Sequence, residues 1–150
     1  MKRIKIKTKV KGCPTKIIRH FDEELFMKLN PPFIKVELNQ FDGCKKDSDL
    51  KLTTNFLGLY QYWHNKVIDR FDSDNLVYFI DEGVEMPFPI TKWIHKHKIV
   101  KIDDQNSYIV DDIEYICSNP IFEFFSYPAI FITMFYRKPI YVDVFNNLEE

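Results

Sequence analysis

Hydrophobic and polar residues alternate along most of the chain, and the first such segment lies near the N-terminus. There the lysines at positions 5, 7 and 9 are interleaved with Ile4, Ile6, Thr8 and Val10. Because successive side chains of a strand point to opposite faces, this pattern predicts a strand with one buried face and one lysine-rich face in water. Further strands are expected at residues 34–39, 50–52, 59–71, 76–82, 93–100 and 108–117.

One of these segments, residues 76–82, is apolar at almost every position as far as Asp81. A strand that is covered on both faces has this composition. The segment is therefore expected to lie buried on both sides.

The segment between the first two strands has a helical period. Its hydrophobic residues recur every four positions, at Ile17, Phe21, Leu25 and Leu29. This spacing predicts one amphipathic helix, or two short helices divided near Asp22, a residue type that suits an N-cap. The prolines at positions 31 and 32 end the helical segment.

The last apolar segment, residues 120–136, predicts one long helix. Asn119 suits the N-cap, Pro120 fits the first helical position, and Glu123 complements the positive end of the helix dipole. At 1.5 Å per residue the helix is roughly 25 Å long, which matches about five strands spaced ~4.8 Å apart. A curved sheet crossed by such a helix encloses a cavity, so binding of a small molecule is the leading hypothesis.

The C-terminal end of this helix is less clearly defined. Arg137 and Lys138 favour the negative end of the helix dipole, and Pro139 is expected to stop the helix. Pro128 lies inside the segment, where a proline kinks or divides a helix, so either one kinked helix or two helices are expected. The uncharged part, residues 124–136, is too short to cross a bilayer, which takes about 20 residues.

Composition and charge exclude several classes of protein. The net charge is -1 with 29% charged residues, so no general attraction to nucleic acid or to an anionic membrane is expected. Cys13, Cys44 and Cys117 are far apart and lack CxxC spacing, which argues against a disulfide framework and favours a reducing, cytoplasmic location. The basic N-terminal segment has no unbroken apolar stretch and does not resemble a signal peptide. Its lysines are interpreted as a solvated strand face, with a phosphate-binding patch as the alternative.

The residues with the most chemical potential lie on the strand at 93–100. Trp93, His95 and His97 share one face, and lysines dominate the other, so the imidazoles are expected to point inward. A tight turn at residues 103–106 places His97 opposite Asp111 or Ile113, depending on register. A His97–Asp111 pair could be structural, could hold a polar group of a ligand, or could act as general base and orienting group. A metal site is not predicted, because His95 and His97 lack an evident third ligand.

Two further groups of residues, a carboxylate pair and an aromatic cluster, have simple structural interpretations. Asp81 and Glu82 form a pair of carboxylates that could take part in acid–base chemistry, but such pairs are commonly solvated acids at strand ends. Trp63 belongs to an aromatic cluster and shares a face with Val67, so core packing is the simpler interpretation. The sequence contains no glycine-rich phosphate loop, nucleophile elbow or HExxH motif.

With the elements in this order, the chain resembles the START-like, helix-grip (SRPBCC) superfamily, which includes the birch-pollen-allergen fold. The resemblance is strongest to small bacterial ligand-binding or cell-division-inhibitor-like proteins of that group. The matching segments are 79–83 with 87–88, 93–97, 111–115 and 135–137. The resemblance implies one α+β domain over residues 1–150, with about seven antiparallel strands curved around a long C-terminal helix and two short helices near the N-terminus. It also implies an apolar cavity between sheet and helix. The superfamily contains lipid, sterol and hormone carriers as well as polyketide cyclases and aromatase-like proteins, so the resemblance implies the cavity and not the activity.

The sequence therefore predicts a protein that binds a small hydrophobic or amphipathic molecule, such as a lipid or polyketide, without a cofactor. The expected ligand-binding residues are Tyr78, Trp93, His95, His97, Asp111, Phe125, Phe131 and Phe135. An enzyme of cyclase or hydratase type, using His97 and Asp111, is the first alternative. A homodimer that buries the outer face of the last helix is the second.

Overall fold

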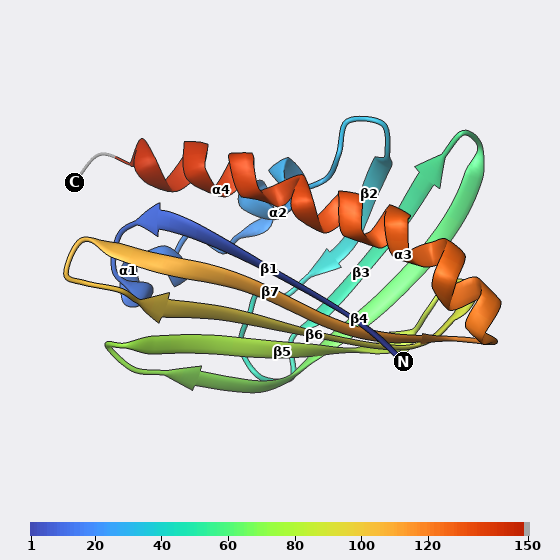
Figure 1. The fold of residues 1–150 in the computed structure, drawn as a ribbon, viewed down its shortest axis with the longest axis horizontal. Coiled ribbons are helices and arrows are strands. Elements are labelled where there is room, and N and C mark those ends of the chain that lie inside the picture. The colour runs from blue at the N-terminus through green and yellow to red at the C-terminus, as the bar shows by residue number, and fades with distance from the viewer. Residues whose placement is uncertain (149–150) are drawn as a thin grey trace.

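The fold is described by a computed structural model that covers residues 1–148 (Figure 1). Its elements follow in the order β1 (Lys2–Lys11), α1 (Pro14–Ile18), α2 (Glu23–Lys28), β2 (Lys35–Phe41), β3 (Asp49–Phe56), β4 (Leu59–Asp72), β5 (Leu76–Glu85), β6 (Ile90–Lys101), β7 (Asn106–Cys117), α3 (Pro120–Phe135) and α4 (Arg137–Asn146). The seven strands form one sheet in the order β1-β7-β6-β5-β4-β3-β2, and every pair is antiparallel. The predicted helix-grip architecture, with its two short helices near the N-terminus, is confirmed.

The sheet is curved, and the C-terminal helices cross its hollow side. Figure 1 shows β2, β3 and β4 rising away from β5, β6 and β7, with α3 and α4 running across the space between them. The predicted alternation is present in β1, where Ile4, Ile6, Thr8 and Val10 are buried. In β5, however, only Val77, Phe79 and Asp81 are buried. The prediction that this strand is covered on both faces is therefore wrong, because apolar residues on its second face stay partly in contact with water.

The N-terminal helical segment consists of two helices, as one of the two sequence interpretations allowed. Asp22 begins α2, and its carboxylate accepts a hydrogen bond from the backbone N–H of Leu25 at 2.9 Å. This bond satisfies one of the amides that a helix N-terminus leaves unpaired. Phe21, Leu25 and Leu29 of this helical segment contribute to the wall of a cavity between the sheet and the helices.

The C-terminal helix continues past the position where the sequence was expected to end it. Pro128 lies inside α3 without dividing it, and the helical run breaks at Tyr136, between α3 and α4. Pro139 is the third residue of α4, where the backbone N–H has no intrahelical partner and a proline is tolerated. Pro139 therefore lies in the first turn of a second helix and does not act as a stop signal.

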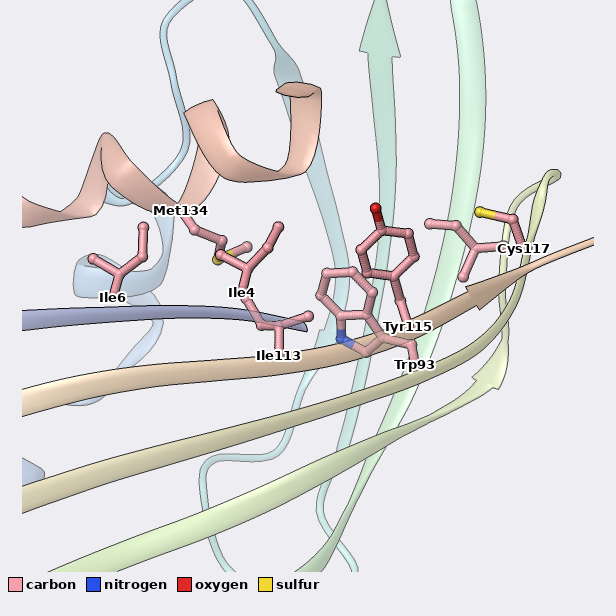
Figure 2. Close-up of a cluster of buried hydrophobic side chains, with 8 residues drawn as sticks. Ile4, Ile6, Trp93, Ile113, Tyr115, Cys117 and Met134 are labelled. Carbon is pink, nitrogen blue, oxygen red and sulfur yellow. The ribbon is translucent and has the colours of Figure 1, made fainter. Parts of the chain in front are cut away.

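Two separate hydrophobic clusters hold the helices to the sheet. Figure 2 shows the first, beneath α3, which includes Ile4, Trp93, Ile113, Tyr115 and Met134. The second lies beneath α4 and the short helices, and contains Val10, Ile17, Leu25, Leu29, Ile99, Ile109, Tyr141 and Phe145.

The strip of sheet between the two clusters is polar. On β6, His95 and His97 lie between Trp93 of the first cluster and Ile99 of the second. On β7, Asp111 lies between Ile113 and Ile109 in the same way. The break between α3 and α4 falls between Met134 of the first cluster and Tyr141 of the second, so the helix junction lies at the level of the polar strip.

The cap of α3 gives a direct test of this architecture. The side chain of Asn119 accepts a hydrogen bond from the backbone N–H of Phe122 at 3.0 Å. Asn119→Ala is expected to lower the free energy of unfolding by about 1 kcal/mol, because that amide loses its partner. Denaturant titration provides the measurement. Gln105→Ala, in an exposed turn, is the control and should change stability by less than about 0.5 kcal/mol. Equal stability of the Asn119 variant and the wild type would contradict the cap.

Candidate ligand-binding cavity

A cavity of about 360 Å³ lies between the hollow face of the sheet and the helices α2, α3 and α4. Most of its wall is apolar, with contributions that include Leu25, Leu52, Trp63, Val67 and Met134. A volume of this size is typical of sites that enclose a small organic molecule. Both tryptophans of the chain, Trp63 and Trp93, line the cavity, and their rings meet edge to face at 5.5 Å.

The polar part of the wall is a group of two histidines and two aspartates. His95 Nε2 lies 2.8 Å from Asp111 Oδ1, and His97 Nε2 lies 2.7 Å from Asp81 Oδ2. These bonds run diagonally, because the residues directly opposite in register are Asp81 with His95 and His97 with Asp111. The two imidazole rings lie between the carboxylates with their centroids 3.6 Å apart.

Arg137, the first residue of α4, completes this group from the helical side. Its Nη1 donates to Asp111 Oδ1 at 3.2 Å, and the residue is 8% exposed. Asp111 is 2% exposed, so its charge is removed from water almost completely. A buried carboxylate is stable only where donors replace its hydration, and His95 and Arg137 supply them.

The electrostatic environment separates the protonation states of these groups. Burial opposes the charge on Asp111, but Arg137 and the hydrogen bond from His95 outweigh burial and hold the pKa of Asp111 below its ordinary value. Burial, and then the neighbouring His97, lowers the pKa of His95 to about 4 against the attraction of Asp111. His95 is therefore neutral at neutral pH. Because an ionised carboxylate can only accept, His95 donates from Nε2 and keeps a lone pair on Nδ1.

Among residues 1–148, six buried side-chain polar atoms have no partner in hydrogen-bonding geometry. They are Trp63 Nε1, Asn65 Oδ1, Asp81 Oδ1, His97 Nδ1, Arg137 Nε and Tyr141 OH. All six belong to residues that line the cavity. Buried polar groups in proteins are almost always paired, so their concentration at one cavity is a distinctive feature of this molecule.

The residues predicted to bind ligand are divided between the cavity and other places. Trp93, His95 and His97 line the cavity, whereas Asp111 lies behind the imidazoles and is not part of the wall. Tyr78 points to the other face of the sheet, where its hydroxyl donates to Asp69 at 3.2 Å.

The three predicted phenylalanines of α3 also lie outside the cavity wall. Phe125, Phe131 and Phe135 are 70%, 38% and 52% exposed, because α3 turns a different stripe toward the sheet. The residues of that stripe are Ser126, Ala129, Ile130, Thr133 and Met134.

The polar group also differs from the sequence interpretation. His97 does lie opposite Asp111 in the register, but its hydrogen-bonded carboxylate is Asp81 and the separation between His97 Nδ1 and Asp111 Oδ1 is 3.6 Å. Asp81 is not a solvated turn acid, since it is 7% exposed and lies within β5. Sequence reasoning treated Arg137 only as a helix-end cation and did not place Tyr141 or Asn65 in a site. The spacing of Arg137 and Tyr141, four residues apart, was the available signal for a shared helix face.

Comparisons with known proteins define the class of fold. No family model and no curated protein matches the sequence. Solved structures do match the fold. A hypothetical protein from Helicobacter pylori aligns with a TM-score of 0.68 and 14% identity, covering 96% of this chain and 88% of that one. Norcoclaurine synthase from Thalictrum flavum, in complex with dopamine and hydroxybenzaldehyde, aligns with a TM-score of 0.64 and 16% identity over 99% and 89% of the two chains. The Zhui aromatase/cyclase of a Streptomyces species aligns with a TM-score of 0.57 and 12% identity over 79% and 69%.

These neighbours are SRPBCC proteins of the birch-pollen-allergen type, so the predicted resemblance is confirmed at the level of the fold. No helix within residues 1–148 has both the length and the apolar character needed to cross a membrane.

Cys44 lines the cavity, and the pH dependence of its reactivity tests whether the cavity wall shields it from water. Burial raises the pKa of Cys44 to about 12, whereas a hydrogen bond with Thr15 lowers the pKa of Cys13. Because the thiolate is the reactive form, iodoacetamide should modify Cys13 first at pH 8. The rate at Cys44 should keep rising with pH after the rate at Cys13 has levelled off. Peptide mass spectrometry over time gives both rates, and unfolding in urea should make them similar. Equal rates in the folded protein would show that Cys44 is not shielded.

Proposed function

We propose that this protein binds a small amphipathic molecule in the cavity, with the apolar body against the aromatic wall and the polar end near the two histidines. The observation that carries the proposal is the set of six unpaired buried atoms on the cavity wall. A buried polar atom without a partner costs about 1–3 kcal/mol. A ligand that supplies the missing partners removes that cost, and this gain adds to the burial of its apolar part.

The unpaired atoms also describe the polar end of the ligand. Trp63 Nε1 and Arg137 Nε are obligatory donors, whereas Asp81 Oδ1 and Asn65 Oδ1 accept. A hydroxyl or carboxylic acid group can both donate and accept, so phenols, hydroxylated polyketides and fatty acids fit this requirement. Two structures with this fold support the choice: norcoclaurine synthase in complex with dopamine and hydroxybenzaldehyde, and an aromatase/cyclase. A reducing, cytoplasmic compartment is the proposed location, because all three cysteines are free.

Filling the cavity with a side chain tests the proposal. Val67 lines the cavity and is 5% exposed, whereas Ile68, the next residue of β4, is 42% exposed and is not part of the cavity wall. Val67→Phe is expected to weaken binding at least about tenfold, since the added ring occupies ligand volume. The control Ile68→Phe should bind like the wild type. Titration of a panel of phenols, fatty acids and sterols can be followed by the fluorescence of Trp63 and Trp93. The absence of any saturable response across the panel would refute the cavity as a binding site.

An enzymatic role is the alternative that uses the same cavity. The structure pairs His97 with Asp81, so these two residues would act as base and orienting group in place of His97 and Asp111. The His97–Asp81 pair is 2.7 Å long and borders the cavity, which is the observation in favour of catalysis. Chromatography of each bound ligand after incubation distinguishes the two roles, because a carrier returns its ligand unchanged and an enzyme does not.

The outer face of α3 supports a homodimer as a second proposal about partners. Six apolar side chains on this face are more than a third exposed: Ile121, Phe124, Phe125, Phe131, Ile132 and Phe135. Contiguous apolar patches of this kind mark interaction sites. The one charged residue of α3, Glu123, is buried, so the face carries no charge that would repel a second copy or attract an anionic lipid surface. A second copy of this chain, related by a two-fold axis, is the occupant that fits.

Sedimentation equilibrium over a range of concentrations tests the dimer. Phe125→Ser should raise the dissociation constant at least about tenfold, because a large aromatic ring at the centre of an interface contributes strongly to binding. Leu57→Ser is the control, since Leu57 is 91% exposed at the turn between β3 and β4. A wild type that stays monomeric at every concentration would contradict self-association. Binding to neutral vesicles by such a monomer would identify lipid as the partner of this face.

A further inference from the structure

A group of three residues at the polar end of the cavity has the composition of a metal site. Asp81 lies on β5, and His95 and His97 lie on β6, with Asp81 directly opposite His95 in the register. One ligand atom from each of these three residues lies within 4.8 Å of the other two. Within the described residues 1–148, no other group of histidines, cysteines and acids meets this condition. We infer that Asp81, His95 and His97 bind one divalent transition-metal ion at the wall of the cavity.

The donor set suits such an ion. Two imidazole nitrogens and one carboxylate oxygen are ligands that zinc and neighbouring first-row metals prefer. Metal–ligand distances of about 2.0–2.2 Å place the ligands of a tetrahedral ion roughly 3.3 Å apart. The largest separation among the three ligand atoms therefore needs to close by at most roughly 1.5 Å. The 2.7 Å contact between His97 Nε2 and Asp81 Oδ2 needs to open by roughly 0.6 Å. Alternation along β6 already turns both imidazoles to the same side, so no change of backbone register is required.

Both rings are also held in place by their neighbours. Phe79 stacks on His97 with centroids 4.2 Å apart and planes 12° apart, and Trp93 meets His95 edge to face at 6.2 Å. Fixed ligand orientation reduces the entropy lost when an ion binds.

Asp111 occupies the position of the outer carboxylate that supports metal-binding histidines. Its Oδ1 lies 2.8 Å from His95 Nε2 and 3.6 Å from His97 Nδ1, so one oxygen faces both rings. With the His95 proton on Nε2, the lone pair of Nδ1 is available to the ion. For His97, Nε2 lies 2.7 Å from Asp81 Oδ2, so these two atoms would bind the ion side by side. Asp111 fixes the tautomer of His95 through their hydrogen bond, as outer carboxylates do for metal-binding histidines.

The charge of the surroundings also favours a cation. Asp81 and Asp111 carry two negative charges in their ionised forms, and Arg137, 3.2 Å from Asp111, carries one positive charge. The group is thus left with one negative charge in a largely buried place, where electrostatic attraction is stronger than in water. Asp81 Oδ1 and His97 Nδ1 have no hydrogen-bond partner within the protein, so neither atom is tied to another group.

Only three protein ligands are available, so one coordination position faces the cavity. Three protein ligands and one open position are typical of metal sites that bind or activate a small molecule. The inference does not depend on the identity of an organic ligand, because the ion is held by the protein alone.

Titration of chelator-treated full-length protein with Zn²⁺ or Co²⁺, without any organic ligand, tests the site. Calorimetry should give one equivalent of bound metal, with micromolar or tighter affinity. Asp81→Asn and His97→Ala should weaken binding by more than about 100-fold, and Asp111→Asn, which alters the outer carboxylate, by about 10–100-fold. His64→Ala is the matched control, because His64 pairs with Asp49 at the same 2.8 Å distance as His95 with Asp111 but belongs to no three-residue group. The His64→Ala variant should bind the metal ion with the same affinity as the wild type.

The absence of stoichiometric binding, or equal losses in the His64 control and in the three variants, would overturn the assignment. Should the variants fail to fold, X-ray absorption of the zinc-loaded wild type decides the question. Two imidazoles and no sulfur support the site, whereas sulfur ligation assigns the metal to cysteines and refutes it. Organic-ligand binding is measured on metal-free protein, so failure of the metal site and failure of the proposed function give different results.

Discussion

The buried negative charge of Asp111 is the constraint on which the rest of the structure depends. A carboxylate that is 2% exposed loses its hydration, and the loss is tolerated only where donors are fixed around it. His95 provides one donor from the adjacent strand, and Arg137 provides another from the first turn of α4. Removing one partner of such a buried pair costs about 3–5 kcal/mol, because the remaining charge is left uncompensated. The ion pair thus fixes where α4 begins relative to β7.

This constraint explains why the interior is divided into two parts. The hydrophobic cluster under α3 and the cluster under α4 are separated by the polar strip of β6 and β7. Apolar side chains cannot donate hydrogen bonds to the Asp111 carboxylate. The junction between α3 and α4 lies next to this residue, and Arg137 at the start of α4 supplies a donor. The cavity lies beside this junction, and its wall includes Arg137 and residues of β3 and β4. These strands rise away from β5, β6 and β7 (Figure 1). The unpaired polar atoms all belong to residues that line this cavity.

The structural neighbours separate the features that come from the fold from those that come from individual side chains. Proteins with 12–16% identity to this chain share its sheet and long helical cover, and they include an aromatase/cyclase and norcoclaurine synthase. A fold that tolerates such divergence defines the place for a ligand but not its chemistry. In this chain the charged and imidazole side chains of the cavity wall include Asp81, His95, His97 and Arg137, which come from two strands and a helix. The proposed ligand and the proposed metal ion both follow from these residues.

Local patterns in the sequence determined most of the fold. The alternation in β1 and β6, the N-caps Asp22 and Asn119, and the apolar length of α3 were each visible in a few neighbouring residues, because strand faces and helix starts depend on local spacing. Local patterns did not determine the hydrogen-bond partners of His95 and His97. Register alone places Asp81 opposite His95 and His97 opposite Asp111. The orientation of the side chains decided that His97 instead bonds to Asp81 and His95 to Asp111. β5 also supplied the third potential metal ligand, which the sequence did not reveal. The rotation of α3 was likewise set by the packing of Met134 and by Arg137 beyond it, which turned Phe125 and Phe131 outward. The sequence by itself therefore determined the elements and their buried faces, whereas only the tertiary structure decided which charges meet, since that depends on contacts between residues far apart in the chain.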